Sequence, residues 1–358
     1  MTVRQVGVVG TGLIGTSIGM ALSRTSLPPV MLVDLSPGRA ETAAALGAGV
    51  AVIEAELASC DHIVLAAPPS HIAGLLLRLQ RLNLHATFSD VASIKSSVLR
   101  EAEILGCDVT RFCPAHPIAG RERGGPTAAV PELFDDAVWV STPAPTTSPE
   151  ASADVRWLAQ ECGARAVEMS ALEHDQALAV VSHLPQFVAT LLATQLPDAG
   201  LAGPTLAGRG FRDTTRLADS QASLWVQIAL GNAAALADAV TRHADAARAL
   251  AEALKAGDSS EIGRLLRAGS DARAALPTKT SPVGVSWATL GVVLQDRPGE
   301  LARLFAVAGD SGVNIEDVTI DHANAHPVGM VALSVAYDSV DTLAGAVRVA
   351  GWHVVPFE

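Results

Sequence analysis

The segment VGVVGTGLIG, residues 6–15, carries the pattern from which the fold of the N-terminal part of this chain is predicted. A short apolar run, typical of a buried strand, leads into the pattern GxGxxG, and helical spacing of apolar residues follows through Leu22. A second apolar run, residues 30–33, ends in Asp34, about 20 residues beyond the glycines. Strand, glycine turn, helix, strand and acid in this order predict a βαβ unit that binds a dinucleotide.

Each part of the glycine pattern has a physical role. Gly10 permits the tight turn, and Gly12 lets a pyrophosphate approach the main chain. Gly15 lets the helix pack closely against the strand. The helix that starts at Leu13 and Ile14 directs its N-terminus at the phosphates. A glycine-rich turn without a ligand is the alternative interpretation.

The acid after the second strand bears on the choice of cofactor. Asp34 is expected to accept hydrogen bonds from the adenosine ribose, which favours NAD over NADP. Arg39 is close enough in the sequence to leave NADP open. Pro68 ends the next apolar run and is expected at the same edge of the sheet, beside the cofactor.

The alternation of strand and helix continues to about residue 170 and predicts a mostly parallel, doubly wound sheet. Helices are expected at 37–46, 70–82, 94–105 and 151–162, and strands at 62–67, 86–91, 111–114, 138–141 and 164–169. Ligands of such sheets bind beyond the carboxyl ends of the strands. Three segments fall there: 68–69, 90–95 and 116–120.

Residues 115–125, AHPIAGRERGG, contain the candidate catalytic residue His116. Pro117 biases the backbone of His116 away from helix, so we expect a loop at the end of a strand. A neutral imidazole there is suited to accept a proton. The alternative is a surface loop with an incidental histidine. Ser93 is expected in the same cleft, with a helix N-cap as its alternative, and for Lys95 a cleft role and a solvated side chain stay open.

Composition limits the class of protein. The chain has 358 residues, a net charge of −12 and 49% hydrophobic residues, which predicts two or three globular domains and argues against a nucleic-acid partner. Its four cysteines show no metal spacing, so we expect reduced thiols, no metal site and a cytoplasmic protein. No signal peptide is expected before the first strand. The apolar stretch 222–240 is expected to be a buried or interface helix and not a membrane span.

Residues 171–276 show long Ala- and Leu-rich helical patterns without strand signals. They carry too much apolar surface for a thin domain, so we expect a homodimer. Arg209, Arg212 and Arg216 gather in one short segment, which predicts a carboxylate clamp because guanidinium pairs with carboxylates bidentately. A solvated helix start with local Asp–Arg pairs is the alternative.

The end of the chain is expected to form a small domain of its own. Residues 277–287 are interpreted as a linker, and 288–358 show the order βαββαβ of a ferredoxin-like plait. The predicted organisation is therefore a Rossmann-type domain at 1–170, a helical substrate and dimerisation domain at 171–276, the linker, and the plait.

Taken together, the motifs resemble the prephenate/arogenate dehydrogenase family of tyrosine biosynthesis with a C-terminal ACT domain. The resemblance covers nearly the whole chain. It rests on the segments 10–15, 90–95, 116–120, 182–185 and 210–216, and on 296–301 and 312–315 for the ACT domain.

The resemblance implies NAD-dependent oxidative decarboxylation of a cyclohexadienol. His116 matches the catalytic histidine that takes the proton of the ring hydroxyl, and Ser93 matches the serine that helps to hold it. Arg216 matches the arginine that binds a substrate carboxylate, and Arg212 lies in the same motif. His183 is a weaker candidate for substrate binding, as is His174, because a structural histidine is an equal alternative for each.

Substrate choice stays open at this point. Many family members carry a second histidine where this chain has Gln186, a position that faces substrate or inhibitor in relatives. Prephenate, giving 4-hydroxyphenylpyruvate, is the main expectation, and arogenate, giving tyrosine, is the alternative. A β-hydroxyacid dehydrogenase would want a lysine on the first long helix, where His174 and His183 stand instead.

The ACT-like domain is expected to bind a regulatory amino acid, tyrosine or another aromatic one, through Gly299, Asn314 and Ile315. A plait that only dimerises is the alternative. A non-catalytic sensor of NAD and amino acids is the remaining hypothesis for the whole chain, but it would not need His116, Ser93 and Arg216 together.

Overall fold

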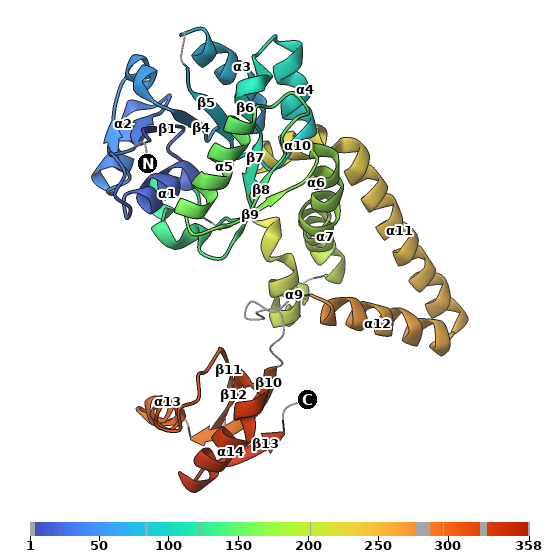
Figure 1. Ribbon diagram of the computed structural model, residues 1–358. Coiled ribbons are helices and arrows are strands. Elements are labelled where there is room, and N and C mark those ends of the chain that lie inside the picture. The colour runs from blue at the N-terminus through green and yellow to red at the C-terminus, as the bar shows by residue number, and fades with distance from the viewer. Residues whose placement is uncertain are drawn as a thin grey trace. The chain divides into compact units, whose positions relative to one another are not determined.

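The computed structural model describes residues 4–82, 85–121, 123–200, 202–276, 287–295, 297–322 and 328–356. The chain forms two compact units, Met1–Ala249 and Leu250–Glu358 (Figure 1). Helix α11 (Ala233–Ala256) crosses the boundary between them. The first unit contains two clusters of buried apolar side chains, and the second contains one.

A six-stranded parallel sheet forms the centre of the first unit, in the order β3-β2-β1-β4-β5-β6. Its strands are β1 (Val6–Val9), β2 (Met31–Val33), β3 (Val50–Ala51), β4 (His62–Leu65), β5 (Thr87–Asp90) and β6 (Phe112–Cys113). β1 and β4 are buried along their whole length, as expected for parallel strands covered on both faces.

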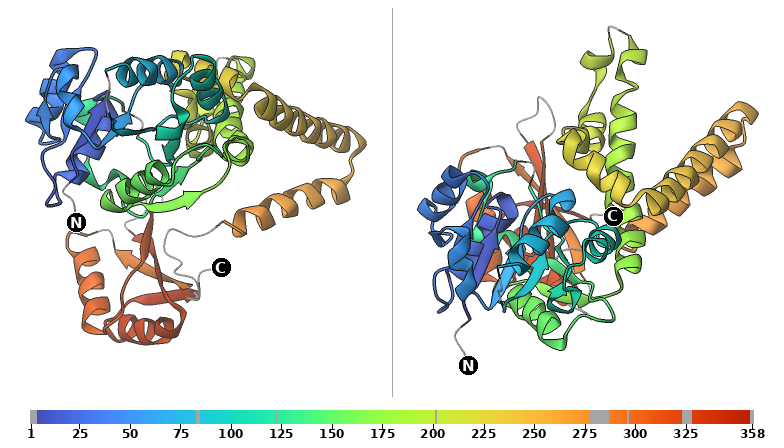
Figure 2. Two further views of the ribbon diagram at one scale, coloured as in Figure 1. Left: turned by 45° about the horizontal axis from the view of Figure 1, so that its top comes forward. Right: turned by 90° about the horizontal axis from the view of Figure 1, so that it is seen from above.

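Helices cover both faces of this sheet (Figures 1 and 2). One buried cluster joins the sheet to α1 (Leu13–Leu22), α2 (Pro37–Ala45) and α5 (Pro149–Glu161). The other cluster joins the sheet to α3 (Pro69–Gln80) and α4 (Ser96–Ile104). The predicted doubly wound sheet is confirmed.

The predicted sheet is nevertheless two sheets. β7 (Ala115–Pro117), β8 (Val138–Ser141) and β9 (Arg165–Glu168) form a separate one, with β7 antiparallel to β8 and β9 parallel to β8. His116 was expected in a loop and lies inside β7 instead. Pro114 has no N–H to donate, so the parallel ladder of β6 stops there and the chain crosses to the second sheet.

The helical part of the first unit begins with α6 (Ala171–Leu178), the single π-turn η5 (Ala179–His183) and α7 (Leu184–Ala193). It continues with α8 (Gly203–Leu206), α9 (Arg209–Thr215), the 3₁₀ turn η7 (Arg216–Ala218) and α10 (Ala222–Gly231). The single helix expected at 222–240 is wrong. α10 and α11 meet at Asn232 with a bend of 98°, because the Asn232 side chain binds other backbone and side-chain groups.

One helical run, Ala171–Ala199, is long and apolar enough to cross a membrane by length and composition alone. It contains His174, Asp175 and His183, whose side chains are buried and hydrogen-bonded inside the first unit. Such polar side chains are those of a protein interior and not of a surface that faces lipid.

The second unit contains α12 (Ser259–Ala274) and a plait with the element order β10-α13-β11-β12-α14-β13. Its antiparallel sheet has the order β11-β12-β10-β13, so the predicted βαββαβ arrangement is confirmed. The elements are β10 (Trp287–Gln295), α13 (Glu300–Asp310), β11 (Asp317–His322), β12 (Val328–Ala336), α14 (Val340–Val349) and β13 (His353–Pro356). The predicted linker lies outside the described residues, except for Trp287.

Candidate functional site

The glycine turn between β1 and α1 has the space that a dinucleotide requires. Gly10 has φ +103°, and a Cβ there would lie 2.2 Å from the carbonyl oxygen of Ala66. A Cβ on Gly15 would lie 2.0 Å from the carbonyl oxygen of Gly10, whereas a Cβ on Gly12 would meet nothing within 4 Å. Gly12 also caps α1 without a side-chain hydrogen bond. The main chain at Gly12, at the N-terminus of α1, is therefore open to close approach by a pyrophosphate.

Asp34 lies at the carboxyl end of β2, beside this turn. Its carboxylate accepts hydrogen bonds from the Thr11 backbone N–H over 2.7 Å and from the Thr11 hydroxyl over 3.0 Å, and from the Ser36 N–H over 2.9 Å. The side chain is half-buried, so these bonds hold the carboxylate at the position where ribose hydroxyls are recognised in dinucleotide-binding βαβ units. Leu13, Ile14 and the exposed Pro68 border the same edge.

A buried ion pair fixes the strand that carries the candidate catalytic histidine. Lys95 and Asp90 are both fully buried, with 2.5 Å between Nζ and Oδ2. Lys95 Nζ also donates to the Ala115 carbonyl oxygen over 2.6 Å, and the Ala115 N–H donates to Asp90 Oδ1 over 2.8 Å. Lys95 is therefore neither a solvated side chain nor exposed in a cleft, since it holds the backbone next to His116.

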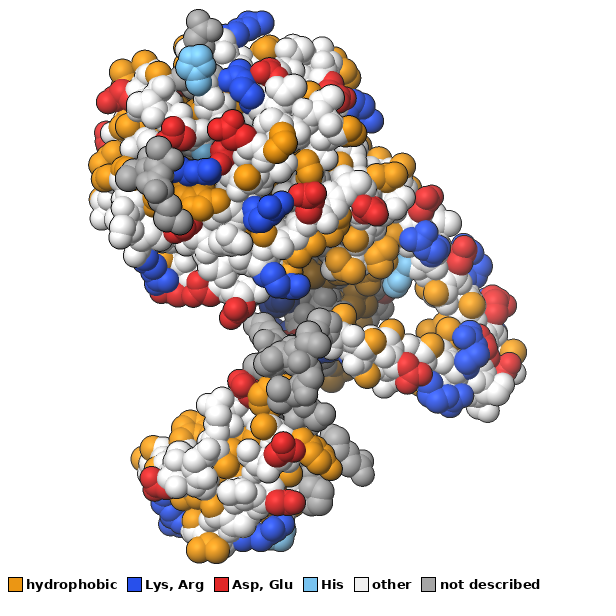
Figure 3. Space-filling view, in the orientation of Figure 1, with side chains coloured by type: hydrophobic (Ala, Val, Ile, Leu, Met, Phe, Trp, Pro, Cys, Tyr) orange, Lys and Arg blue, Asp and Glu red, His pale blue; other side chains and the backbone are white. Residues whose placement is uncertain are grey.

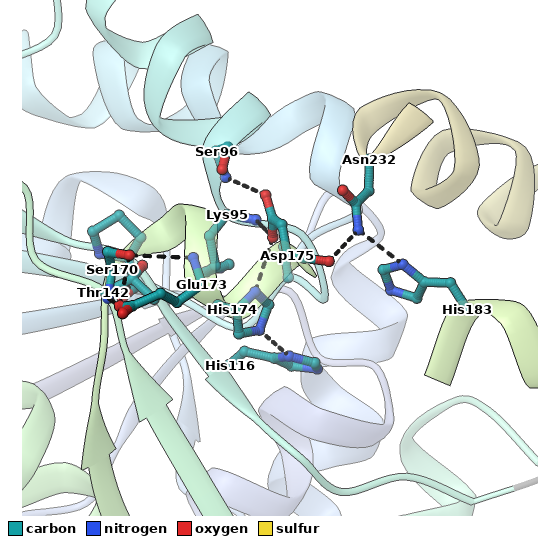
Figure 4. A network of polar contacts seen from close by, with 12 residues as sticks. Lys95, Ser96, His116, Thr142, Ser170, Glu173, His174, Asp175, His183 and Asn232 are labelled. Atoms are coloured by element: carbon teal, nitrogen blue, oxygen red, sulfur yellow. Dashed lines mark hydrogen bonds and ion pairs between the residues drawn. The ribbon is translucent and has the colours of Figure 1, made fainter. Parts of the chain in front are cut away.

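His116 is half-buried and forms one end of a line of three side chains (Figure 4). Its Nδ1 lies 2.9 Å from Nε2 of His174, and Nδ1 of His174 lies 2.9 Å from Oδ1 of Asp175. Asp175 also accepts hydrogen bonds from the backbone N–H groups of Lys95 and Ser96, over 2.9 and 2.8 Å, at the start of α4. Among the described residues, Nε2 of His116 makes no hydrogen bond.

Burial keeps the imidazole of His116 neutral. Desolvation lowers its pKa well below the usual 6.5, and the nearby Lys95, His174 and His183 act in the same direction. The cation that contributes to this lowering of the pKa is Lys95. A neutral ring with a free nitrogen can accept a proton at neutral pH.

His183 is fully buried and lies behind this line. Its Nδ1 is 3.2 Å from the side-chain amide nitrogen of Asn232, which also donates to the Asp175 carbonyl oxygen over 2.7 Å. Its buried Nε2 has no hydrogen bond of good geometry among the described residues. Desolvation lowers the pKa of His183 to about 4, while Asp175 and the backbone of the half-buried Ser93 act to raise it. Ser93 and His183 thus lie together near His116.

The arginine segment, residues 209–216, packs against α7. Arg216 begins η7 and Arg212 lies on α9, and both are exposed. Gln186, which we expected to face substrate, is buried in α7 and donates from its amide to the Leu217 carbonyl oxygen over 2.7 Å. Its Oε1 lies 3.3 Å from the Ser220 hydroxyl. The Gln186 side chain therefore holds the turn that carries Arg216.

Sequence reasoning undervalued the residues that support His116. His174 was only a weak candidate, and Asp175 and Asn232 were given no role. The available signal was an adjacent His-Asp pair at the start of a helix whose spacing is otherwise apolar. Buried ionisable residues in such a helix are paired.

The second unit has a cavity of about 360 Å³ at the turn between β10 and α13. Gly299, with φ +91°, lies at this turn, and Arg297 and Glu300 also line the cavity. Its apolar walls come from Leu294, Leu301, Ile320 and Val331. Asn314 and Ile315, expected to act with Gly299, are not among the residues that line it.

Comparison with known proteins agrees with this geometry. Residues 18–168 match the family model for the prephenate dehydrogenase nucleotide-binding domain, and residues 170–268 match the model for the prephenate dehydrogenase dimerization domain. A probable prephenate dehydrogenase of Streptomyces niveus, NovF, is 33% identical over 360 residues, which cover 98% of this chain and 99% of that protein.

Two solved structures are each similar to about three quarters of the chain. Prephenate dehydrogenase from Aquifex aeolicus, in complex with hydroxyphenyl propionate and NAD⁺, has a TM-score of 0.71 and 27% identity, and the match covers 76% of this chain and 98% of that one. Arogenate dehydrogenase from Synechocystis has a TM-score of 0.66 and 29% identity, with 75% and 99% covered. Together with the glycine turn and its N-terminal helix, these matches show that the chain is an NAD-dependent oxidoreductase of the prephenate dehydrogenase family.

Proposed function

We propose that the protein oxidises prephenate with NAD and releases CO₂, giving 4-hydroxyphenylpyruvate for tyrosine biosynthesis. The observation that carries this proposal is His116, a neutral imidazole bound through Nδ1 and with Nε2 free of protein hydrogen bonds among the described residues. A base at this position suits the removal of a proton from a ring hydroxyl.

The chemistry needs one base and one hydride acceptor. When bound, NAD would supply the acceptor for the hydride of the ring carbon that bears the hydroxyl. His116 Nε2 takes the hydroxyl proton as the carbonyl forms, and it returns this proton to the oxygen when loss of CO₂ makes the ring aromatic. The proton is thus conserved over the cycle. Desolvation around His116 keeps the imidazole neutral before the reaction, which preserves its capacity as a base.

Binding of the substrate is assigned to the arginine segment and to side chains near this base. Arg216, with Arg212 nearby on α9, binds a substrate carboxylate, since guanidinium and carboxylate form paired hydrogen bonds. Ser93 and His183, whose Nε2 is buried, interact near His116 and are assigned to the same substrate site. On the cofactor side, the α1 N-terminus, Asp34 and Pro68 hold NAD.

Arogenate is the second candidate substrate, and the similarity to the Synechocystis enzyme supports it. Arogenate carries an amine that calls for a carboxylate partner. The Streptomyces relative, which matches the whole length of this chain and is named a probable prephenate dehydrogenase, favours prephenate.

We further propose that the plait is an ACT domain that binds an aromatic amino acid. The cavity beside Gly299 supports this role, because Arg297 offers a cation for a carboxylate and the apolar walls suit an aromatic ring. We also propose that the domains end where the sequence indicates, at residues 170, 276 and 287.

We also propose that the protein is a homodimer and is located in the cytoplasm. The helical segment matches a dimerization domain, and it exposes apolar side chains such as Leu191, Val226 and Leu230. Hydrophobic side chains gather on the helical part of the first unit (Figure 3). A protein partner would remove this surface from water.

Reduction of the cofactor tests the activity directly. Purified protein is mixed with prephenate or arogenate and with NAD or NADP, and absorbance of the reduced nicotinamide is followed. Turnover with prephenate and NAD is expected, and His116→Asn should abolish it while NAD binding persists. Turnover with arogenate but not with prephenate would identify arogenate as the substrate. Absence of turnover with both substrates would contradict the proposal and favour a sensor, and a tyrosine titration would then examine the plait.

A further inference from the structure

With a neutral His174, the line from Asp175 to His116 has only one direction that satisfies every hydrogen bond. Two of the partners of Asp175, the backbone N–H groups of Lys95 and Ser96, can only donate, so the carboxylate accepts from both. Burial acts to raise the pKa of Asp175, but hydrogen bonds from His174 and Ser96 outweigh this and lower it. Asp175 is therefore an ionised acceptor, and an ionised carboxylate has no hydrogen to donate.

The donor and acceptor of each hydrogen bond then determine those of the next bond along the line. Because Asp175 Oδ1 accepts, Nδ1 of His174 carries a hydrogen, and Nε2 of a neutral His174 has only a lone pair. That lone pair is 2.9 Å from Nδ1 of His116, so Nδ1 of His116 must carry a hydrogen. In a neutral imidazole one nitrogen donates and the other accepts. The lone pair of His116 is consequently on Nε2.

We propose that Asp175 and His174 are positioning residues that fix the tautomer of His116, with hydrogen on Nδ1 and the lone pair on Nε2. The catalytic part of this proposal rests on the proposed function, because Nε2 is the nitrogen assigned to the substrate proton. His174 is fully buried, so it acts on the reaction through His116 and not by contact with solvent.

The surroundings favour the same arrangement. The charged and titratable groups near the His116–His174 pair are Lys95 from the start of α4, Asp90 from β5, Asp175 from α6 and His183 from η5. Lys95 and Asp90 are already paired with each other and with the Ala115 backbone. Asp175 is then the anion hydrogen-bonded to the pair, and it stabilises the imidazolium that forms when His116 accepts a proton.

The tautomer itself can be measured without any turnover. In the full-length protein labelled with ¹⁵N-histidine, long-range ¹H–¹⁵N spectra at mildly alkaline pH distinguish a protonated Nδ1 from a protonated Nε2. The His116 signals are assigned by their loss in His116→Asn. We expect a protonated Nδ1 in the wild type. A protonated Nε2 on His116 would overturn the proposal, whatever substrate the enzyme turns over.

Kinetics test the consequence for catalysis. His174→Ala should lower kcat by about tenfold or more with KM for substrate and NAD unchanged, because His174 touches neither. His174→Gln should recover part of kcat, since its amide oxygen can accept from Nδ1 of His116. His85→Asn is the matched control, because His85 is exposed at the opposite, amino end of β5, and it should leave both constants unchanged.

Two results would contradict the role of His174. One is a His174→Ala enzyme that keeps the wild-type kcat, and the other is a rise in KM without a change in kcat. Should His174→Ala fail to fold, the comparison moves to His174→Gln, in which a protonated Nε2 on His116 together with the wild-type kcat would equally reject the proposal. Failure of the proposed function would appear differently, as a wild-type enzyme without turnover but with the expected tautomer.

Discussion

The side-chain amide of Asn232 donates a hydrogen bond to the backbone carbonyl oxygen of Asp175 over 2.7 Å. The break between α10 and α11 is thereby tied to the helix that carries the residues behind His116. Asn232 is 6% exposed, so this contact belongs to the interior of the first unit. The residue at the 98° bend between α10 and α11 thus takes part in the architecture of the site.

Removal of this amide should destabilise the first unit. Asn232→Ala leaves the Asp175 carbonyl and His183 Nδ1 without their partner, and it favours helix across the bend. We expect the free energy of unfolding to fall by about 1–3 kcal/mol, measured by urea denaturation with tryptophan fluorescence. Gln176→Ala, which removes an exposed amide from α6, is the control and should change little. Equal effects of the two substitutions would contradict this role for Asn232.

Two glycines of the cofactor turn should respond in opposite ways. Gly12→Ala places its methyl group in open space, so the fold should be kept while the pyrophosphate is excluded. We expect the Kd for NAD, measured by calorimetry, to rise by about tenfold or more, with an unchanged urea midpoint. Gly15→Ala forces a methyl group onto the Gly10 carbonyl, and it should lower the free energy of unfolding by about 1–3 kcal/mol. A stable Gly15→Ala protein, or unaltered NAD binding in Gly12→Ala, would be inconsistent with this geometry.

Lys95 should matter more for stability than an ordinary surface cation. Lys95→Met leaves Asp90 charged and buried, which costs about 3–5 kcal/mol. The double variant Asp90→Asn/Lys95→Met removes both charges and should recover most of that loss. Arg24, whose ion pair with Glu132 is exposed, provides the control, since Arg24→Met should cost less than about 1 kcal/mol. Urea unfolding of the four proteins measures these differences. A Lys95→Met protein as stable as the double variant would show that the charge of Asp90 is compensated elsewhere.

Stability should fall in mildly acidic solution because of buried neutral histidines. Desolvation lowers the pKa of His62 from 6.5 to about 3, and Arg4 acts in the same direction. Between these values the unfolded chain binds a proton that the folded chain does not, so the free energy of unfolding decreases as pH falls. One such group contributes a slope of up to about 1.4 kcal/mol per pH unit.

The contribution of His62 can be separated by substitution. His62→Gln keeps groups that can hydrogen-bond to Thr87 and Ser89, and it should flatten the dependence of urea stability on pH below about 6.5. Exposed His85→Gln should not. His116 and His183, whose pKa values are also lowered by burial, account for the slope that remains. An unchanged slope in His62→Gln would mean that His62 titrates normally.

Gln186 should affect binding of the substrate and not the chemical step. Gln186→Ala releases η7, which begins with Arg216, from its hydrogen bond with α7. One lost hydrogen bond of about 1 kcal/mol corresponds to a rise in KM for prephenate of roughly fivefold, with kcat unchanged. Gln176→Ala is again the control. A collapse of kcat at constant KM would instead place Gln186 at the reacting part of the substrate.

Much of the fold could be predicted because local patterns and tertiary structure agree. The apolar runs ending in Val9 and Val33, the glycines between them and the periodicity of α1 all indicate one βαβ unit. The βαββαβ order of the plait was equally visible in its sequence. At such places each segment encodes its own structure, and packing only completes it.

The supporting residues of the site could not be predicted for the opposite reason. From the sequence, a cleft role and a solvated side chain are equally open for Lys95, and only its ion pair with Asp90 shows why it is buried. Asn232 breaks a helix that its neighbours favour, because its partners lie on α6 and η5. These roles depend on residues between 5 and 57 positions away, which no local pattern records.

Because Lys95 donates a hydrogen bond to the Ala115 carbonyl, the position of β7 and of His116 depends on the length of the short connection between β5 and α4. Surface connections usually tolerate insertions and deletions. Here, however, Asp90 and Lys95 at the two ends of the connection hold β7 in place, because they bond to the N–H and the carbonyl oxygen of Ala115. A single added residue there would shift Lys95 relative to Asp90 and displace His116 from its line with His174. We therefore expect natural length variation in this protein's relatives to avoid residues 91–95 and to accumulate in connections at the opposite edge of the sheet.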